Sequence, residues 1–137
     1  MNTPIMRTIT LILSLCALPV SAQTALTAEQ FEARVEGKTL DFGYDGETPY
    51  GLERYLPDRR VLWSWGDNTC EPGKWYENDG EICFVYEFDP TPQCWTYYDM
   101  DGRLMAVFMN DIDTATGTVV YELSPVAREL ICDNFGM

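Results

Sequence analysis

The chain has 137 residues, with 22 acidic and nine basic side chains and a formal net charge of −13 at neutral pH. This charge disfavours nucleic acid and anionic membrane surfaces as partners, because the chain offers no basic patch to release counterions from phosphates. A cationic protein or metal ions remain possible partners, and alternatively the acidic surface serves only solubility. The chain contains no histidine, which excludes Ser-His-Asp and Cys-His mechanisms and metal sites with histidine ligands.

Residues 1–22 have the layout of a secretory signal peptide. Arg7 supplies the basic start, an apolar run extends from Ile9 to Leu18, and small residues directly precede the expected cut after Ala22. We therefore predict export to the periplasm or the medium. The apolar run is shorter than the roughly 20 residues that span a bilayer, and no later stretch approaches that length.

Two alternatives to cleavage after Ala22 involve the same segment. It would act as a membrane anchor if it were retained, or it would be cut and lipidated at Cys16, although Leu15 stands where lipoprotein processing favours a small residue. Cleavage after Ala22 leaves 137 − 22 = 115 residues. That length suits one domain with one core, residues 23–137.

The first predicted element of the mature chain is a short helix within residues 26–37. Thr27 is placed as its N-cap, Gln30 follows three residues later as in a capping box, and Gly37 can end the helix. Its apolar positions, Phe31 among them, are few. The helix must therefore pack against a larger body to be stable.

From Lys38 onward, short β-type runs alternate with turns rich in Gly, Asp, Asn and Pro, which predicts an antiparallel meander. The predicted strands lie near residues 38–42, 50–55, 61–65, 73–77, 81–87, 93–98, 103–109 and 118–123. Eight strands favour a closed, lipocalin-like barrel, with a two-sheet sandwich as the alternative. A short helix is expected within Pro125–Cys132. Ile82–Phe88 is apolar on both faces, so either the N-terminal helix or a partner should cover its outer face.

Four cysteines remain after cleavage, and an even number in an oxidising compartment predicts two disulfides with three possible connectivities. A zinc site is the rival, but no Cys-x-x-Cys spacing and no histidine is present. Pairing the strands on either side of an expected turn at Asp89–Pro92 places Cys83 opposite Cys94 within disulfide reach. By elimination, Cys70 pairs with Cys132 and ties the C-terminal segment to the Gly66–Pro72 loop.

Aromatic residues are numerous for a domain of this size. The four tryptophans either fill a small core or line an apolar or sugar-binding pocket in a barrel mouth: Trp63, Trp65, Trp75 and Trp95. Such residues more often fill a small core than line a pocket. Val61, Trp63 and Trp65 alternate so that they share one face of a strand.

Carboxylates supply two further hypotheses. Asp99, Asp101, Asp111 and Asp113 lie in turn-forming stretches and could begin a calcium site, although Asp-Gly is also a common hairpin turn and Asn110 stands where an EF-hand needs glutamate. A carboxylate pair could also support a hydrolase. The abundance of acids is no evidence for one, because sequence does not show which carboxylates are close.

The motifs Gly73-Lys74-Trp75, Gly80-Glu81-Ile82-Cys83 and Cys94-Trp95, with Gly37-Lys38-Thr39 after a short helix, mark a family resemblance. The chain resembles small exported bacterial proteins grouped as domain of unknown function 995, over roughly residues 26–110. The resemblance implies a secreted β-rich domain without an assigned activity and carries over no catalytic residues. The stretch Tyr44–Trp65 matches no motif.

These patterns together predict an exported, non-enzymatic binding module without a cofactor, which engages a small apolar ligand or a protein. The alternative is an inhibitor-like protein whose acidic face docks on a cationic enzyme such as a lysozyme. Docking of that kind weakens steeply as salt rises, whereas burial of an apolar ligand does not. A carboxylate-based hydrolase is the third possibility.

We expect the protein purified from the exported fraction to begin at Gln23 and to contain no free thiol. Its intact mass should equal that of residues 23–137 less four hydrogens, because two disulfides remove four thiol protons. A mass that retains residues 1–22, or a lipid on Cys16, would contradict the predicted processing.

Overall fold

The computed structural model describes residues 23–44, 48–110, 117–123 and 128–136, which form eight strands, one α-helix and two 3-10 turns. The helix is α1 (Ala28–Val35), and the 3-10 turns are η1 (Pro57–Arg59) and η2 (Asp133–Phe135). The strands are β1 (Thr39–Tyr44), β2 (Thr48–Tyr55), β3 (Arg60–Ser64), β4 (Glu71–Asn78), β5 (Glu81–Tyr86), β6 (Asp89–Met100), β7 (Arg103–Phe108) and β8 (Val119–Glu122). No helix within these ranges is long and apolar enough to span a bilayer.

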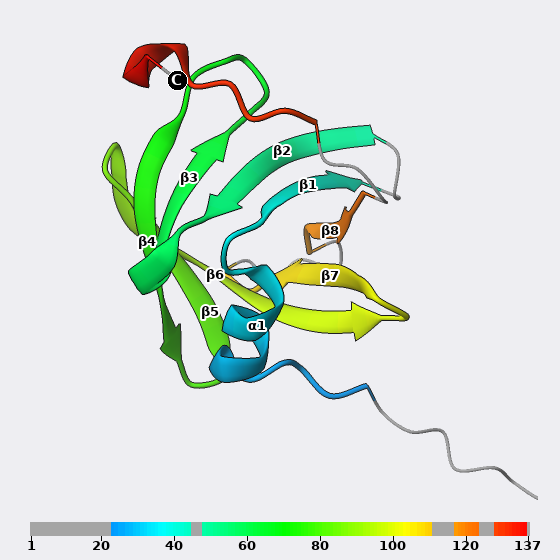
Figure 1. Ribbon diagram of the computed structural model, residues 1–137. Helices are drawn as coiled ribbons and strands as arrows, with labels where there is room; N and C mark the ends of the chain where they lie inside the picture. The colour runs from blue at the N-terminus through cyan, green and yellow to red at the C-terminus, as the bar shows by residue number, and fades with distance from the viewer. Residues whose placement is uncertain (1–22, 45–47, 111–116, 124–127, 137) are drawn as a thin grey trace, which may run out of the picture.

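The strands pair in chain order, each antiparallel to the next, and β8 returns to β1 (Figure 1). Phe42 opposite Glu122 and Gly43 opposite Tyr121 close the ring. The predicted closed meander is therefore confirmed, and the sandwich alternative is wrong because a single sheet closes on itself. Strand bounds differ from prediction by a few residues, except that β6 begins earlier, at Asp89.

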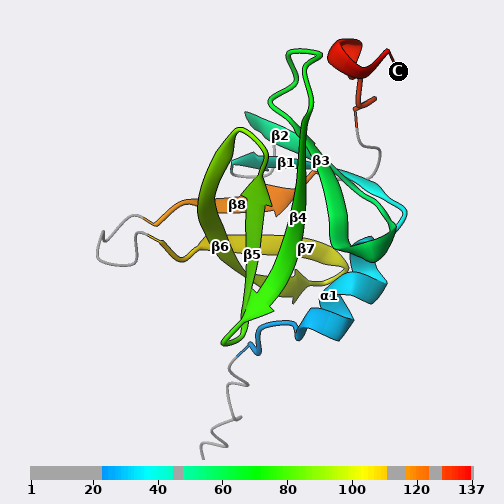
Figure 2. The ribbon, with the colours of Figure 1, turned by 90° about the vertical axis from the view of Figure 1, so that its left-hand side faces the viewer.

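Helix α1 covers one end of the barrel, as Figures 1 and 2 show from two sides. Phe31 is fully buried among side chains of the barrel interior, with its ring centroid 4.3 Å from that of Tyr97, 5.2 Å from that of Trp75 and 5.7 Å from that of Tyr55. The helix therefore closes the barrel end. It does not cover the outer face of β5, which was one of the two possibilities for Ile82–Phe88.

The predicted boundaries of α1 are confirmed. Thr27 and Gln30 form both hydrogen bonds of the capping box, and Gly37 follows the helix with a φ of +79°, which glycine adopts at little cost. Arg34 forms an ion pair with Glu122 of β8, with 3.1 Å between Nη2 and Oε2. These contacts fix the helix against the closed end.

The hairpin of β5 and β6 turns at Glu87-Phe88, not at the predicted Asp89–Pro92. Tyr86 pairs with Asp89 and Phe84 pairs with Gln93, so the extra residues of β6 form a bulge between them. The bulge restores the register, and Cys83 still lies opposite Cys94. The structure joins these two cysteines, and it joins Cys70 to Cys132, the two pairs that the sequence predicted.

The C-terminal segment packs on the outside of the barrel near β1, β2 and β3. The predicted short C-terminal helix is present as the 3-10 turn η2, which directly follows the expected range of Pro125–Cys132. Residues 128–132 have no regular structure, and residues 124–127 lie outside the described ranges. Arg128 holds the carboxylate of Asp41 with two hydrogen bonds of 2.7 and 2.8 Å. A second apolar cluster lies beneath the segment: Leu52, Leu62, Cys70, Leu130 and Cys132.

Replacing each disulfide by paired alanines should destabilise the barrel unequally. The bridge from Cys70 to Cys132 closes a loop with a sequence separation of 62, against 11 for Cys83 to Cys94. Loop-closure entropy predicts a loss of about 4 kcal/mol for the first pair and about 3 kcal/mol for the second. Urea unfolding of the two double variants measures both, and a larger loss for the Cys83→Ala, Cys94→Ala variant would contradict this ranking.

Candidate ligand pocket

A pocket opens at the end of the barrel opposite α1. Its cavity is about 50 Å³, well below the roughly 300–1,000 Å³ of typical small-molecule sites, and the volume reaches about 500 Å³ only when the open mouth and the gaps between side chains are included. A cavity of this size holds only a few water molecules, so the rings at the mouth must separate to admit a slender organic ligand. The pocket is lined by Phe42, Tyr50, Glu53, Tyr55, Trp63, Trp65, Glu71, Phe84, Tyr86, Gln93, Trp95, Tyr97 and Val120.

Tyr50 is the centre of an aromatic group at the mouth. Its ring centroid lies 5.4 Å from that of Trp65, 5.5 Å from that of Trp63 and 6.3 Å from that of Trp95, all at steep angles. The contacts with Trp65 and Trp95 are edge-to-face and the contact with Trp63 is tilted, and such angled contacts stabilise a group of rings without face-to-face stacking. Trp65 is 56% exposed, whereas Trp63 and Trp95 are buried.

A bulge in β2 accounts for the inward position of Tyr50. Phe42 pairs with Gly51 and Gly43 pairs with Pro49, which leaves Tyr50 as an extra residue in the strand. Bulges commonly redirect a side chain in this way. Gly51 is required beside it, because a Cβ there would collide with the indole of Trp63.

The floor of the pocket holds a buried carboxyl group. Glu53 is 2% exposed, and the hydroxyl of Tyr86 donates to it, at 3.1 Å from Oε2 and 3.3 Å from Oε1. Gly73 faces Tyr86 across the β4–β5 ladder, and a Cβ on Gly73 would lie 2.7 Å from the Tyr86 ring. The absence of a side chain at Gly73 therefore gives Tyr86 the position from which it reaches Glu53.

Burial determines the electrostatics of this floor. Desolvation raises the pKa of Glu53 well above its ordinary value, the Tyr86 hydrogen bond partly opposes this, and the charge of Glu71 adds to it. Burial, followed by the nearby Tyr44 and Glu53, raises the pKa of Tyr50 to about 12. The phenol of Tyr50 is therefore neutral near pH 7, and the environment of Glu53 favours its uncharged form.

Three of the four tryptophans named from the sequence line the pocket, and Trp75 does not. Trp75 packs against Phe31 at the closed end, and the guanidinium carbon of Arg59 lies 4.4 Å from the centroid of the Trp75 ring. Sequence reasoning missed Tyr50, Glu53 and Tyr86. One available signal was that Glu53 shares a strand face with Tyr55, which would place an acid among apolar residues.

The acids named for calcium are only partly within the described residues. The Asp99 carboxylate accepts a hydrogen bond of 2.7 Å from the Gly102 N–H, and Asp101 occupies the hairpin turn with a positive φ. Both therefore shape a turn. Asp111 and Asp113 lie outside the described ranges.

Glu81, Cys83 and Cys94 form a cluster of metal-ligand type within the described part of the chain. The two sulfur atoms are joined in a disulfide, so they have no thiolate to offer a metal. The cluster therefore is not a metal site while the bridge is intact.

Comparison of the chain with protein-family models, curated proteins and solved structures finds no match. The resemblance to proteins of domain of unknown function 995 thus stays a sequence-based prediction. One fold supports many functions, so the barrel alone assigns none. Function has to be inferred from the chemistry of the pocket.

Replacing Glu53 by glutamine should remove a pH-dependent loss of stability. Because the pKa of Glu53 is higher in the folded chain than in the unfolded chain, the folded state binds more protons and loses stability as pH rises above about 4.5. The free energy of unfolding falls by at most about 1.4 kcal/mol per pH unit until the pH reaches the pKa of Glu53 in the folded chain. The free energy of unfolding of Glu53→Gln, minus that of the wild type, should therefore increase as pH rises. Urea unfolding at about pH 5, 6 and 7 measures this difference.

Glu71→Gln is the matched control for that series, because it removes one carboxylate from the same pocket at a half-buried position. Its stability should follow the wild type across the series more closely than that of Glu53→Gln does. Parallel curves for the wild type and Glu53→Gln would show that the carboxyl titrates alike in the folded and unfolded chains.

Proposed function

We propose that the protein is an exported, non-enzymatic binding module that holds a small, largely apolar ligand inside its barrel. One observation carries this proposal: a pocket lined mainly by aromatic rings is open at one end and closed by α1 at the other. Concave apolar pockets with a few convergent polar groups are typical of small-molecule sites. Glu53, Tyr86 and Gln93 supply those polar groups here.

The exposed rings at the mouth add support. Trp65 and Tyr44 leave a large part of their surfaces in water, and both contact the Tyr50 group. Apolar surface that borders a pocket and lacks cover is typical of a binding site. A ligand that enters between these rings would remove that surface from water.

A carboxylate-based hydrolase is the second candidate, because Glu53 and Glu71 line the same pocket. A carboxyl with a raised pKa beside a second acid is the arrangement that glycosidases use for general acid catalysis. Docking on a cationic enzyme rests on the net charge alone, and the arrangement of the pocket residues does not add to it. We therefore place ligand binding first.

Trp65→Ala tests ligand binding, because Trp65 borders the pocket and its exposure makes it dispensable for folding. We expect wild-type protein to bind the neutral fluorescent probe N-phenyl-1-naphthylamine, and Trp65→Ala to bind it on the order of tenfold more weakly. Tyr76→Ala is the control, since Tyr76 is 39% exposed on β4 opposite the outward-facing Cys83. Probe fluorescence titrated against each protein gives the dissociation constants.

Equal affinity of Trp65→Ala and the wild type, or no binding at all, would overturn the proposed site. Turnover of glycosides that disappears in Glu53→Gln would favour the hydrolase instead. Binding to a lysozyme that weakens steeply with salt, without any effect of Trp65→Ala, would favour acidic docking.

A further inference from the structure

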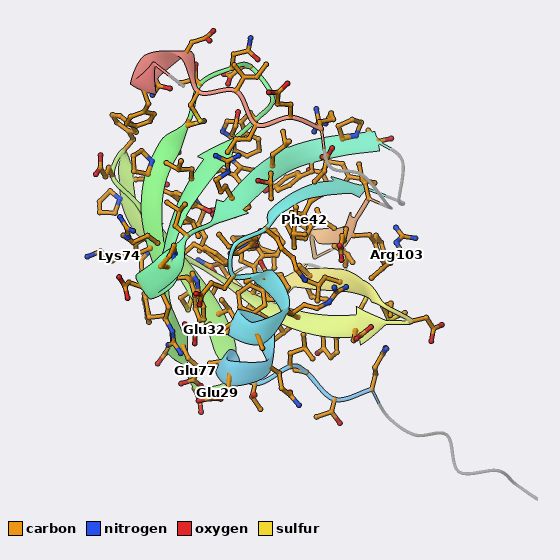
Figure 3. The ribbon with its side chains drawn as sticks, viewed as in Figure 1. Glu29, Glu32, Phe42, Lys74, Glu77 and Arg103 are labelled. Atoms are coloured by element: carbon orange, nitrogen blue, oxygen red, sulfur yellow. A yellow bond between two sulfur atoms is a disulfide. The ribbon has the colours of Figure 1, made fainter. Side chains whose placement is uncertain are left out.

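The pocket contains acids and no base. The chain has nine Lys and Arg residues; Arg7 lies in the segment outside the described residues, and none of the other eight lines the pocket. Lys74 and Arg103 extend outward from opposite sides of the barrel in Figure 3. Glu53 and Glu71, by contrast, both line the pocket. A cation that pairs with the ionised form of Glu53 there must therefore come from outside the described residues.

Glu53 also has unused capacity for hydrogen bonds. The two oxygens of a carboxylate offer about four acceptor positions, and one phenol supplies a single hydrogen. Tyr86 is the one side-chain donor to Glu53 in the described residues. The buried carboxyl can therefore accept further donors from a group in the pocket.

We propose that the pocket selects a slender organic amine, whose ammonium group binds the Glu53 carboxylate while its apolar body lies between the rings of Tyr50, Trp63 and Trp95. This inference rests on the proposed binding function and specifies its ligand class. An ammonium forms short, charge-assisted hydrogen bonds with a carboxylate and is attracted to the faces of aromatic rings. The net charge of −13 also attracts cations toward the barrel.

The same contacts disfavour the other common apolar ligands. A fatty acid would place a second carboxyl group beside Glu53, and without a cation between them the two groups could not both be ionised without repulsion. A neutral alcohol can donate one hydrogen bond to Glu53 but gains no ionic attraction. The order of affinity for a matched series is therefore amine, alcohol, carboxylate.

Binding of an ammonium ion should be accompanied by loss of a proton. The ammonium favours the ionised carboxylate, so Glu53 in its acid form releases its proton to solvent when the pair forms, and no covalent bond changes. The titratable groups that face Glu53 are Glu71 of β4, Tyr86 of β5, Tyr97 of β6, and Tyr50 and Tyr55 of β2. All four phenols have raised pKa values and keep their protons, so the phenols are not the source of the released proton.

Isothermal titration calorimetry with n-hexylamine, 1-hexanol and hexanoate tests the inference on the full mature protein. We expect wild-type protein to bind the amine at least about tenfold more tightly than the alcohol, and the carboxylate most weakly. Glu53→Gln should bring the amine-to-alcohol ratio close to one. Glu29→Gln, the matched control, should retain the preference because Glu29 is an exposed acid on α1 and does not line the pocket.

The outcomes separate this inference from the proposed function. Equal binding of the amine and the alcohol, or an unchanged ratio in Glu53→Gln, would overturn the amine inference and leave apolar binding intact. No binding of any of the three compounds or of N-phenyl-1-naphthylamine would overturn both. If Glu53→Gln does not fold, the protons that the wild-type protein releases on binding the amine provide the test. The binding enthalpy should then differ between phosphate and Tris buffers, and equal enthalpies would overturn the inference.

Discussion

The packing of Phe31 into one end of the barrel is the constraint on which the rest of the structure depends. An eight-stranded barrel encloses just enough space for its own side chains or for one small ligand. Phe31 fills the closed end against Trp75 and Tyr97, so the remaining space of the interior lies toward the other end. Without that packing, the short helix would lack a partner, and the pocket would have no floor.

The buried carboxyl of Glu53 works against stability and in favour of recognition. A polar group without water costs free energy unless it is hydrogen-bonded, and Tyr86 offsets only part of that cost. The same dry surroundings strengthen any interaction that a ligand head group makes with the carboxyl. The two disulfides supply stability elsewhere, and the Arg128–Asp41 ion pair, whose carboxylate is buried, holds the C-terminal segment against the outside of the barrel.

The sequence predicted the fold more fully than the site, for physical reasons that particular residues illustrate. Turn motifs such as Asn78-Asp79-Gly80 act locally. They therefore divide the chain into strands regardless of which elements those strands pack against. The site depended on side-chain direction. β2 is apolar on both faces, with Leu52 facing the C-terminal segment and Tyr55 facing the interior, so alternation did not reveal that Glu53 points inward. The bulge at Tyr50 reverses the expected direction as well.

The sequence by itself determined the number and order of the strands, the capped helix, the pairing of the cysteines and the excess of acid. Each of these follows from local backbone preferences or from counting residues. Only the tertiary structure decided that Trp75 belongs to the closed end, that Trp63, Trp65 and Trp95 surround one pocket, and that Glu53 lies beneath them. Closure of the barrel brings β2, β4, β5 and β6 around a common interior, and no local pattern records which residues of distant strands meet there.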